Sequence, residues 1–169
     1  MKILFIRSGN NGRDPISTRQ GESLQKIGLE IDFYDVIGKG ILGYLANIPQ
    51  LRKYIHKVRP DIIHAHYSLC GIVAALARPK LPIVTSLMGS DLIQATLIIQ
   101  LIIRQLSRHI WTRTIVKSND LFQRLKNDRA IILLNGVDSD LFFEMDKNQA
   151  LEKLGWSRNI KHILFLKYL

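Results

Sequence analysis

Four short apolar runs in this chain end abruptly in polar, titratable side chains. The run at 60–63 leads into His64 and His66, which are two residues apart and therefore point to the same side of an extended strand. Three further runs end in the same way, at 88–91, 117–120 and 135–138. Because parallel strands present their carboxyl ends at one edge of a sheet, we expect these four segments to meet there.

The histidine pair is the first candidate for chemistry. An imidazole with a near-neutral pKa suits proton handling, or a hydrogen bond to a hydroxyl or phosphate, and we assign that role to His66 at the rim. His64, one step deeper in the strand, is predicted to be a hydrogen-bonded core histidine. No Asp, Glu or Cys cluster with ligand spacing accompanies the pair, so no metal site is predicted.

Five other residues at the predicted rim are candidate binding residues, each with a structural alternative. Backbone N–H groups around Gly9 and Gly12 either hold an anion or form a plain turn, and the spacing is not a dinucleotide fingerprint. Gly89 permits close approach of a ligand, and Asp91 either accepts from a sugar hydroxyl or caps the following helix. Lys117 either faces a phosphate or is a surface lysine.

Composition sets broad limits on what the chain can be. Its 169 residues favour one domain, and 47% hydrophobic content is enough for a core. The formal charge of +10 suits phosphates, sugar nucleotides, nucleic acid or anionic lipid. A single cysteine, Cys70, rules out an internal disulfide and so suggests a reducing, cytosolic setting. Cys70 itself is predicted to be a small buried hydrophobe. The apolar stretch at 92–103 is too short to span a bilayer.

Strand and helix patterns alternate along the whole chain. Asp14 followed by Pro15 suits the N-cap and the first position of a helix. We expect a loop at 38–43, and we expect Pro49 to shift the start of its helix or to kink it. The predicted strands are 1–7, 30–36, 61–64, 82–86, 114–116, 131–134 and 160–166, and the predicted helices are 16–27, 45–58, 71–77, 92–110, 119–126 and 147–154. Such alternation is typical of an α/β fold with a mostly parallel sheet covered on both faces.

Together these segments resemble the N-terminal domain of family 4 glycosyltransferases of the GT-B fold. The resemblance rests on four motifs in order: Pro60–His66, Thr85–Asp91, Lys117–Ser118 and Asn135–Asp138. It implies a Rossmann-like three-layer sandwich that shapes the acceptor site, facing a second domain that binds most of a nucleotide-sugar. It also implies a retaining transfer without an essential metal or cofactor, in which His66 contacts the transferred sugar or the acceptor.

Two departures from the family pattern carry expectations of their own. Met88 stands where the family often has a histidine, which removes one possible hydrogen bond to substrate. The donor-binding second domain is missing, so we expect residues 1–155 to form the acceptor-side domain and 156–169 a linker and the first strand of that missing domain. Such a truncated chain is predicted to be inactive alone.

The expected partners follow from the same resemblance and from charge. They are a nucleotide-sugar and a glycan or lipid-linked acceptor. The basic surface and the apolar helix from Leu92 suggest peripheral association with anionic membrane at its cytoplasmic face. A non-catalytic anion- or nucleotide-binding module is the alternative function. A nucleic-acid-binding protein is disfavoured, because the cations are scattered and no nucleic-acid motif is present.

Overall fold

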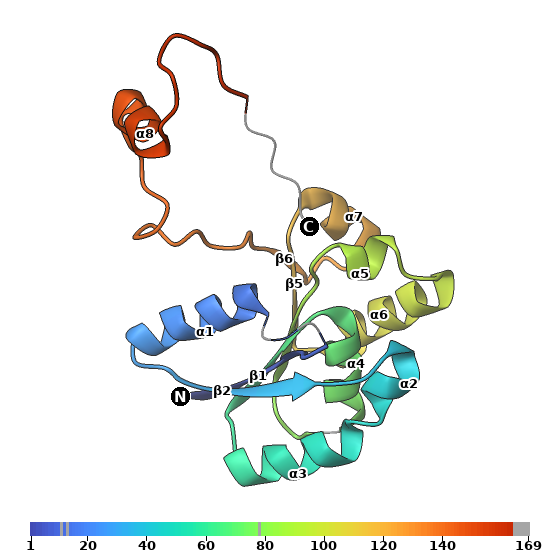
Figure 1. Ribbon diagram of the computed structural model, residues 1–169. Helices are drawn as coiled ribbons and strands as arrows, with labels where there is room; N and C mark the ends of the chain where they lie inside the picture. The colour runs from blue at the N-terminus through green and yellow to red at the C-terminus, as the bar shows by residue number, and fades with distance from the viewer. Residues whose placement is uncertain (11, 13, 78, 164–169) are drawn as a thin grey trace. The chain divides into compact units, whose positions relative to one another are not determined.

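A computed structural model of the protein describes residues 1–10, 12, 14–77 and 79–163. Its centre is a six-stranded sheet with the strand order β2-β1-β3-β4-β5-β6 (Figure 1). The strands are β1 Lys2–Ser8, β2 Glu30–Val36, β3 Ile62–His66, β4 Ile83–Ser86, β5 Arg113–Val116 and β6 Ile131–Ile132. Every pairing between neighbouring strands is parallel, so the predicted α/β fold is confirmed with a sheet that is wholly, not mostly, parallel.

Helices connect the strands and cover the sheet. They are α1 Pro15–Lys26, α2 Gly40–Leu45, α3 Ile48–Val58, α4 Ser68–Leu76, α5 Ser90–Ile93, α6 Leu97–His109, α7 Asn119–Leu125 and α8 Lys147–Leu154. Helix α1 contacts β1 and β2, whereas α4 contacts β1, β3 and β4. Figure 1 shows α1 and α4 on opposite faces of the sheet, which gives the three layers that alternation predicts.

Side-chain alternation along the central strands explains how both faces are filled. Leu4 and Ile6 belong to the larger apolar cluster, which α3, α4 and α6 cover, and Phe5 belongs to a smaller cluster with residues of α1 and β2. All three side chains are fully buried. A strand that is apolar on both faces must lie between two layers of helices.

Sequence patterns placed most elements well, but they missed one helix and did not divide another. The glycine-rich segment expected to be a loop contains α2, and Pro49 lies in the first turn of α3, so it shifts the start of that helix. The helix expected over 92–110 is two helices, because Thr96 has an extended backbone (φ −62°, ψ 157°) between α5 and α6.

The predicted strands near the end of the chain are shorter than their apolar runs. Strand β6 contains only Ile131 and Ile132, although the run continues to Leu134. Residues 160–163, predicted to begin a strand, have no strand structure, and the rest of that predicted strand lies outside the described residues. The chain divides into two compact units, Met1–Asn135 and Gly136–Leu169, and the second unit contains α8.

Among the described residues, no helix combines the length and the apolar character needed to cross a bilayer.

Candidate functional site

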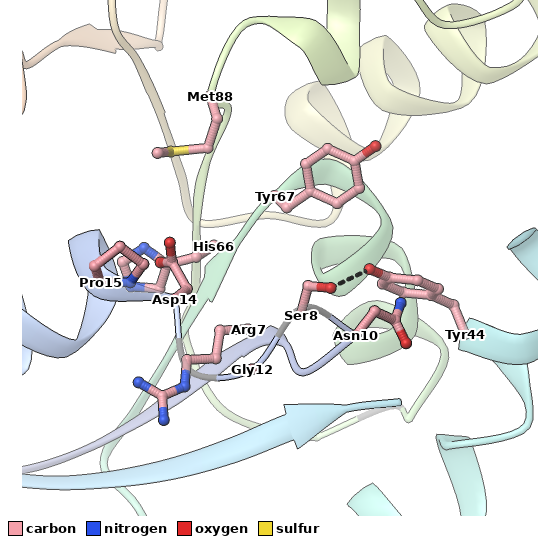
Figure 2. A pocket seen from close by; sticks show the side chains of 10 residues that line it. All are labelled: Arg7, Ser8, Asn10, Gly12, Asp14, Pro15, Tyr44, His66, Tyr67 and Met88. Carbon is pink, nitrogen blue, oxygen red and sulfur yellow. Dashed lines mark hydrogen bonds between the residues drawn. The ribbon is translucent and has the colours of Figure 1, made fainter. Parts of the chain in front are cut away.

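A cavity of about 580 Å³ lies at the carboxyl edge of the sheet. Its walls come from the ends of β1, β3 and β4, from the start of α1 and from α2 (Figure 2). The lining residues are Arg7, Ser8, Asn10, Gly12, Asp14, Pro15, Tyr44, His66, Tyr67 and Met88. Ligands of open parallel α/β sheets bind in this position, next to the point where the chain reverses its direction of travel across the sheet.

The two predicted histidines form a stacked pair beneath this cavity. Their ring centroids are 4.3 Å apart, and the ring of Phe5 contacts both. Nε2 of His64 lies 2.9 Å from Oγ of Ser86, which confirms the hydrogen-bonded core histidine. His66 lines the cavity although its side chain is buried, and its Nε2 has no hydrogen-bond partner among the described residues.

Burial sets the charge state of the pair. It lowers the pKa of His64 to about 4, with a smaller contribution from the charge of Lys117. It lowers the pKa of His66 to about 2, helped by the charges of His64, Lys117 and Arg7. Both rings are therefore neutral at pH 7, and the near-neutral pKa expected for His66 is wrong because that expectation assumed a rim open to water. A neutral ring can still accept one hydrogen bond and donate another.

Replacing His66 by phenylalanine is expected to stabilise the chain by about 1–2 kcal/mol, since it removes a buried polar atom without a partner. It should also halve the loss of stability between pH 6.5 and 4. The unfolded chain binds a proton on each histidine below its ordinary pKa of 6.5, whereas the native chain excludes both. Each histidine therefore contributes a slope of about 1.4 kcal/mol per pH unit, which urea unfolding at several pH values measures.

The matched control for this prediction is His56→Phe on α3, whose side chain is exposed. We expect the control to leave the pH slope of stability unchanged. If the free energy of unfolding of His66→Phe depends on pH with the same slope as that of the wild type, His66 carries a proton in the native chain.

The buried carboxylate of Asp91 connects the loops that follow β3 and β4 through hydrogen bonds. Its Oδ2 accepts from the backbone N–H of Ser68 at 2.9 Å, and its Oδ1 accepts from those of Met88 at 3.1 Å and Gly89 at 2.9 Å. Burial raises the pKa of Asp91, while these N–H bonds lower it. The structure thus places Asp91 beneath the loops after β3 and β4, where it joins them. It does not cap the following helix, whose N-cap residue is Gly89 without a side-chain hydrogen bond.

These two loops contain strained backbone at the cavity. Tyr67 has φ 88°, a value that non-glycine residues rarely adopt, and its N–H donates to the carbonyl of Ser86 at 2.9 Å. Gly89 has φ 115°, where a glycine is needed. Asp91 bonds to the residue after Tyr67 and to Gly89 itself. The hydrogen bonds of Asp91 therefore hold these strained residues in position beside the cavity, which Tyr67 and Met88 line.

The two predicted glycines after β1 differ in position. Gly12 lines the cavity, whereas Gly9 packs against β2, where an added Cβ would lie 3.0 Å from Cβ of Asp35. The N-terminus of α1 is already capped, because Asp14 accepts from the N–H of Ser17 at 2.8 Å. The capping prediction for Asp14 is confirmed, and its carboxylate offsets the positive end of the helix that was expected to attract an anion.

Lys117 follows β5 on the same face of the sheet as the histidine pair. It is half-buried, and burial lowers its pKa. Its charge is close enough to lower the pKa of both histidines, although its side chain does not line the cavity. The predicted site residues therefore follow neighbouring strands at one edge of the sheet, but only His66 and Gly12 face the cavity itself.

Arg7 is a cavity residue that the sequence analysis missed. Its guanidinium is buried, with Nε 2.6 Å from Oδ1 of Asp35 and Nη1 2.6 Å from Oγ1 of Thr18. It also lies 4.3 Å from the centroid of the Phe33 ring. The signal was present in the alternation of β1, because Arg7 occupies the same face as Phe5 and the predicted histidines.

Three neutral polar side chains complete the cavity, and they too were missed. The hydroxyl of Tyr44 donates to Oγ of Ser8 at 2.7 Å, as Figure 2 shows. The side-chain amide of Asn10 exchanges two hydrogen bonds with the backbone of Gly38, at 2.7 and 2.8 Å. These contacts join the end of β1 to α2, and the loop after β1 to the loop after β2. Sequence pattern could not find Tyr44, because its segment reads as a glycine-rich loop.

The cavity combines neutral hydrogen-bonding groups and aromatic rings with two charged residues, Arg7 and Asp14, which already bond to Asp35 and to the N–H of Ser17. Tyr44, Tyr67 and Ser8 offer hydroxyls, and burial raises the pKa of both phenols, so they remain protonated. His66 adds a neutral ring nitrogen. Among the described residues, no group of three or more His, Cys, Asp or Glu side chains is arranged to hold a metal ion. Such a cavity suits a ligand rich in hydroxyl groups.

Three solved structures share this fold. Sucrose-phosphate synthase from Thermosynechococcus elongatus superposes with a TM-score of 0.72 and 15% identity, over 94% of this chain and 53% of that one. HepE from Anabaena, solved in complex with UDP and glucose, superposes with a TM-score of 0.60 and 18% identity, over 92% of this chain and 50% of that one. MurG from Acinetobacter baumannii superposes with a TM-score of 0.56 and 9% identity, over 81% of this chain and 46% of that one.

At identities this low the superpositions show the fold alone, and the chain spans about half the length of those three structures. No curated protein sequence matches the chain significantly. The family profile described as "Glycosyl transferase 4-like" matches residues 14–119, which include α1, the histidine pair and the segment from Met88 to Lys117. The chain therefore belongs to the glycosyl transferase 4-like family, with the fold of an N-terminal GT-B domain.

Proposed function

We propose that the chain is the acceptor-side domain of a retaining glycosyltransferase, which moves a sugar from a nucleotide-sugar to a glycan or lipid-linked acceptor. The family and the fold support a sugar-transferring enzyme. The lining of the cavity supports its role on the acceptor side, since its hydroxyls and aromatic rings suit a saccharide, and its charged residues Arg7 and Asp14 are already bonded within the domain. The expected setting is the cytoplasm.

One observation carries this proposal. Nε2 of His66 is buried without a hydrogen-bond partner among the described residues, in a side chain that lines the cavity. An unpartnered buried polar atom costs about 1–3 kcal/mol, so a native chain that keeps one is expected to use it. A sugar hydroxyl that enters the cavity would supply the missing partner.

We expect the chain alone to transfer sugar negligibly. A departing diphosphate needs several positive or N–H groups, whereas the N-terminus of α1 is capped by Asp14 and the guanidinium of Arg7 already bonds to Asp35. The related structures are about twice as long. We propose that residues 1–155 form the acceptor-side domain, that a second domain begins near residue 156 and supplies the remaining groups, and that no metal is essential.

Amide NMR of the chain with two probes, methyl glycosides and UDP, tests the proposal. Methyl glycosides should shift the amide signals of Ser8, Tyr67 and Met88, and His66→Phe should weaken their binding about tenfold through the loss of one hydrogen bond. His56→Phe is the control. Incubation with UDP-sugars should give no transfer, so robust transfer by this chain would contradict the requirement for a second domain.

A non-catalytic nucleotide-binding module is the second candidate. The charges of Lys117 and Arg7 near the histidine pair favour it, and HepE was solved with UDP. It predicts that UDP binds to the chain while methyl glycosides shift no cavity signal. That result would replace the acceptor-side proposal.

A further inference from the structure

The outward face of α6 carries an exposed group of aliphatic side chains. Leu97 is 83% exposed, Ile98 72% and Leu101 56%, and Ile93 at the end of α5 is 52% exposed. We call these four residues the α6 patch. Four aliphatic side chains within two turns of one surface are unusual, because single exposed hydrophobic residues are common on monomeric proteins and contiguous groups mark interaction sites.

Packing against the domain does not account for this composition. The inner face of α6 meets the core through Ile103, which is fully buried, with Ile99 and Leu106 partly buried beside it. The patch lies on the other side of the helix, away from these contacts. Figure 1 shows α6 at the margin of the domain, with α5 leading into it. The apolar character of the outward face therefore remains unexplained by folding.

Every formally charged side chain within α6 itself is positive. No aspartate or glutamate occurs between Asp91 and Asp120 in the sequence. Leu97, Leu101, Arg104 and Arg108 follow one another at intervals of four, three and four residues, which places them on one ridge of the helix. Nε of Arg104 donates to the carbonyl of Arg124 at 3.2 Å, and Nε of Arg108 to that of Lys126 at 3.2 Å.

These hydrogen bonds place the positive side chains near the C-terminal end of α6. The C-terminal half of α6 lies beside the end of α7, which brings Arg104 and Arg108 to the same region as Arg124 and Lys126. The side chain of Arg124 is paired with Asp120, one turn earlier on α7. Arg108, Arg124 and Lys126 are exposed. On one face of α6, aliphatic side chains are followed by positive ones. This pattern is typical of a helix that lies in a membrane interface, where its aliphatic side chains contact acyl chains and its cations contact lipid phosphates.

We propose that the α6 patch and these four cations form a docking surface for an anionic lipid bilayer. The helix would lie flat on the membrane. It begins in the connection after β4, at the carboxyl edge of the sheet where the cavity also opens, so docking would bring that cavity close to the lipid headgroups. The docking surface and its test do not depend on saccharide binding or on sugar transfer.

Sedimentation with vesicles tests the proposal on the whole chain. The chain should bind vesicles that contain phosphatidylglycerol and should bind pure phosphatidylcholine vesicles weakly, with binding that falls as salt is added. Leu97→Gln with Ile98→Gln should weaken binding on the order of 100-fold, because two aliphatic side chains lose their burial in lipid. Ile27→Gln with Ile110→Gln is the matched control, since those side chains are 73% and 54% exposed and lie at the C-terminal ends of α1 and α6, outside the α6 patch.

A second measurement keeps the test independent of how the variants fold. An environment-sensitive dye on a cysteine introduced at Ile98 should shift to the blue with anionic vesicles, and the same dye at Ile27 should not. The natural Cys70 is buried and will label poorly. Equal binding by both double variants, no preference for anionic lipid, or a dimer in solution that Leu97→Gln and Ile98→Gln dissociate would each overturn the proposal.

Discussion

Replacing Asp91 by alanine is expected to lower the free energy of unfolding by about 3–5 kcal/mol. The carboxylate accepts from three backbone N–H groups, those of Ser68, Met88 and Gly89. Its loss leaves these donors beside the strained backbone of Tyr67, and each unsatisfied buried donor costs about 1–3 kcal/mol. The midpoint of thermal unfolding should fall by about 10 °C, which circular dichroism can measure.

Two further variants separate the effect of these hydrogen bonds from the effect of removing a negative charge. Asp91→Asn keeps the shape but turns one acceptor into a donor, so it should lose the bond to Ser68 and about 2 kcal/mol. Asp120→Asn on α7 removes an exposed carboxylate paired with Arg124 and should change stability by less than about 0.5 kcal/mol. If Asp91→Ala has the same midpoint of thermal unfolding as the wild type, the three N–H groups find other partners, and Asp91 is free to bind a ligand.

Replacing Gly71 by valine is expected to destabilise the chain by about 3 kcal/mol. A Cβ at this position in α4 would lie 2.7 Å from Cζ2 of Trp111 and 2.8 Å from Cγ2 of Thr85, and both side chains are buried. The Nε1–H of Trp111 also donates to the Gly71 carbonyl at 3.2 Å, so displacing the indole breaks a buried hydrogen bond. Overpacking of a filled core costs about 1–3 kcal/mol, and the lost bond adds to it.

Gly71→Ala is the milder member of this series. The steric cost should exceed the gain of about 1 kcal/mol from helix propensity, leaving a net loss of about 1–2 kcal/mol in urea unfolding. Gly136→Val is the control, because a Cβ there meets no atom within 4 Å. Wild-type stability of Gly71→Ala would mean that Trp111 and Thr85 can move apart without cost.

Local signals in the sequence were sufficient for most elements. Asp14 followed by Pro15 predicted the start of α1, and Asp14 caps it as expected. The two histidines in an apolar strand predicted that both lie on one face, where they are stacked. These predictions succeeded because alternation, capping and proline geometry act over a few residues.

Other features depended on contacts between distant segments. The break between α5 and α6 was invisible because the apolar run continues through it, and α2 was hidden by its glycines. The role of Asp91 required two loops to meet around it. The lowered pKa of His66 required the burial that Phe5 and His64 provide.

By itself, the sequence determined that strands and helices alternate and which side chains follow the strand ends, because periodicity and turn chemistry are local. Tertiary structure alone decided which of those side chains face the cavity, which are buried and connect two loops, and which aliphatic residues of α6 remain outside. The physical reason is that hydrogen-bond satisfaction, desolvation and packing are set by neighbours remote in the chain, and no local pattern specifies them.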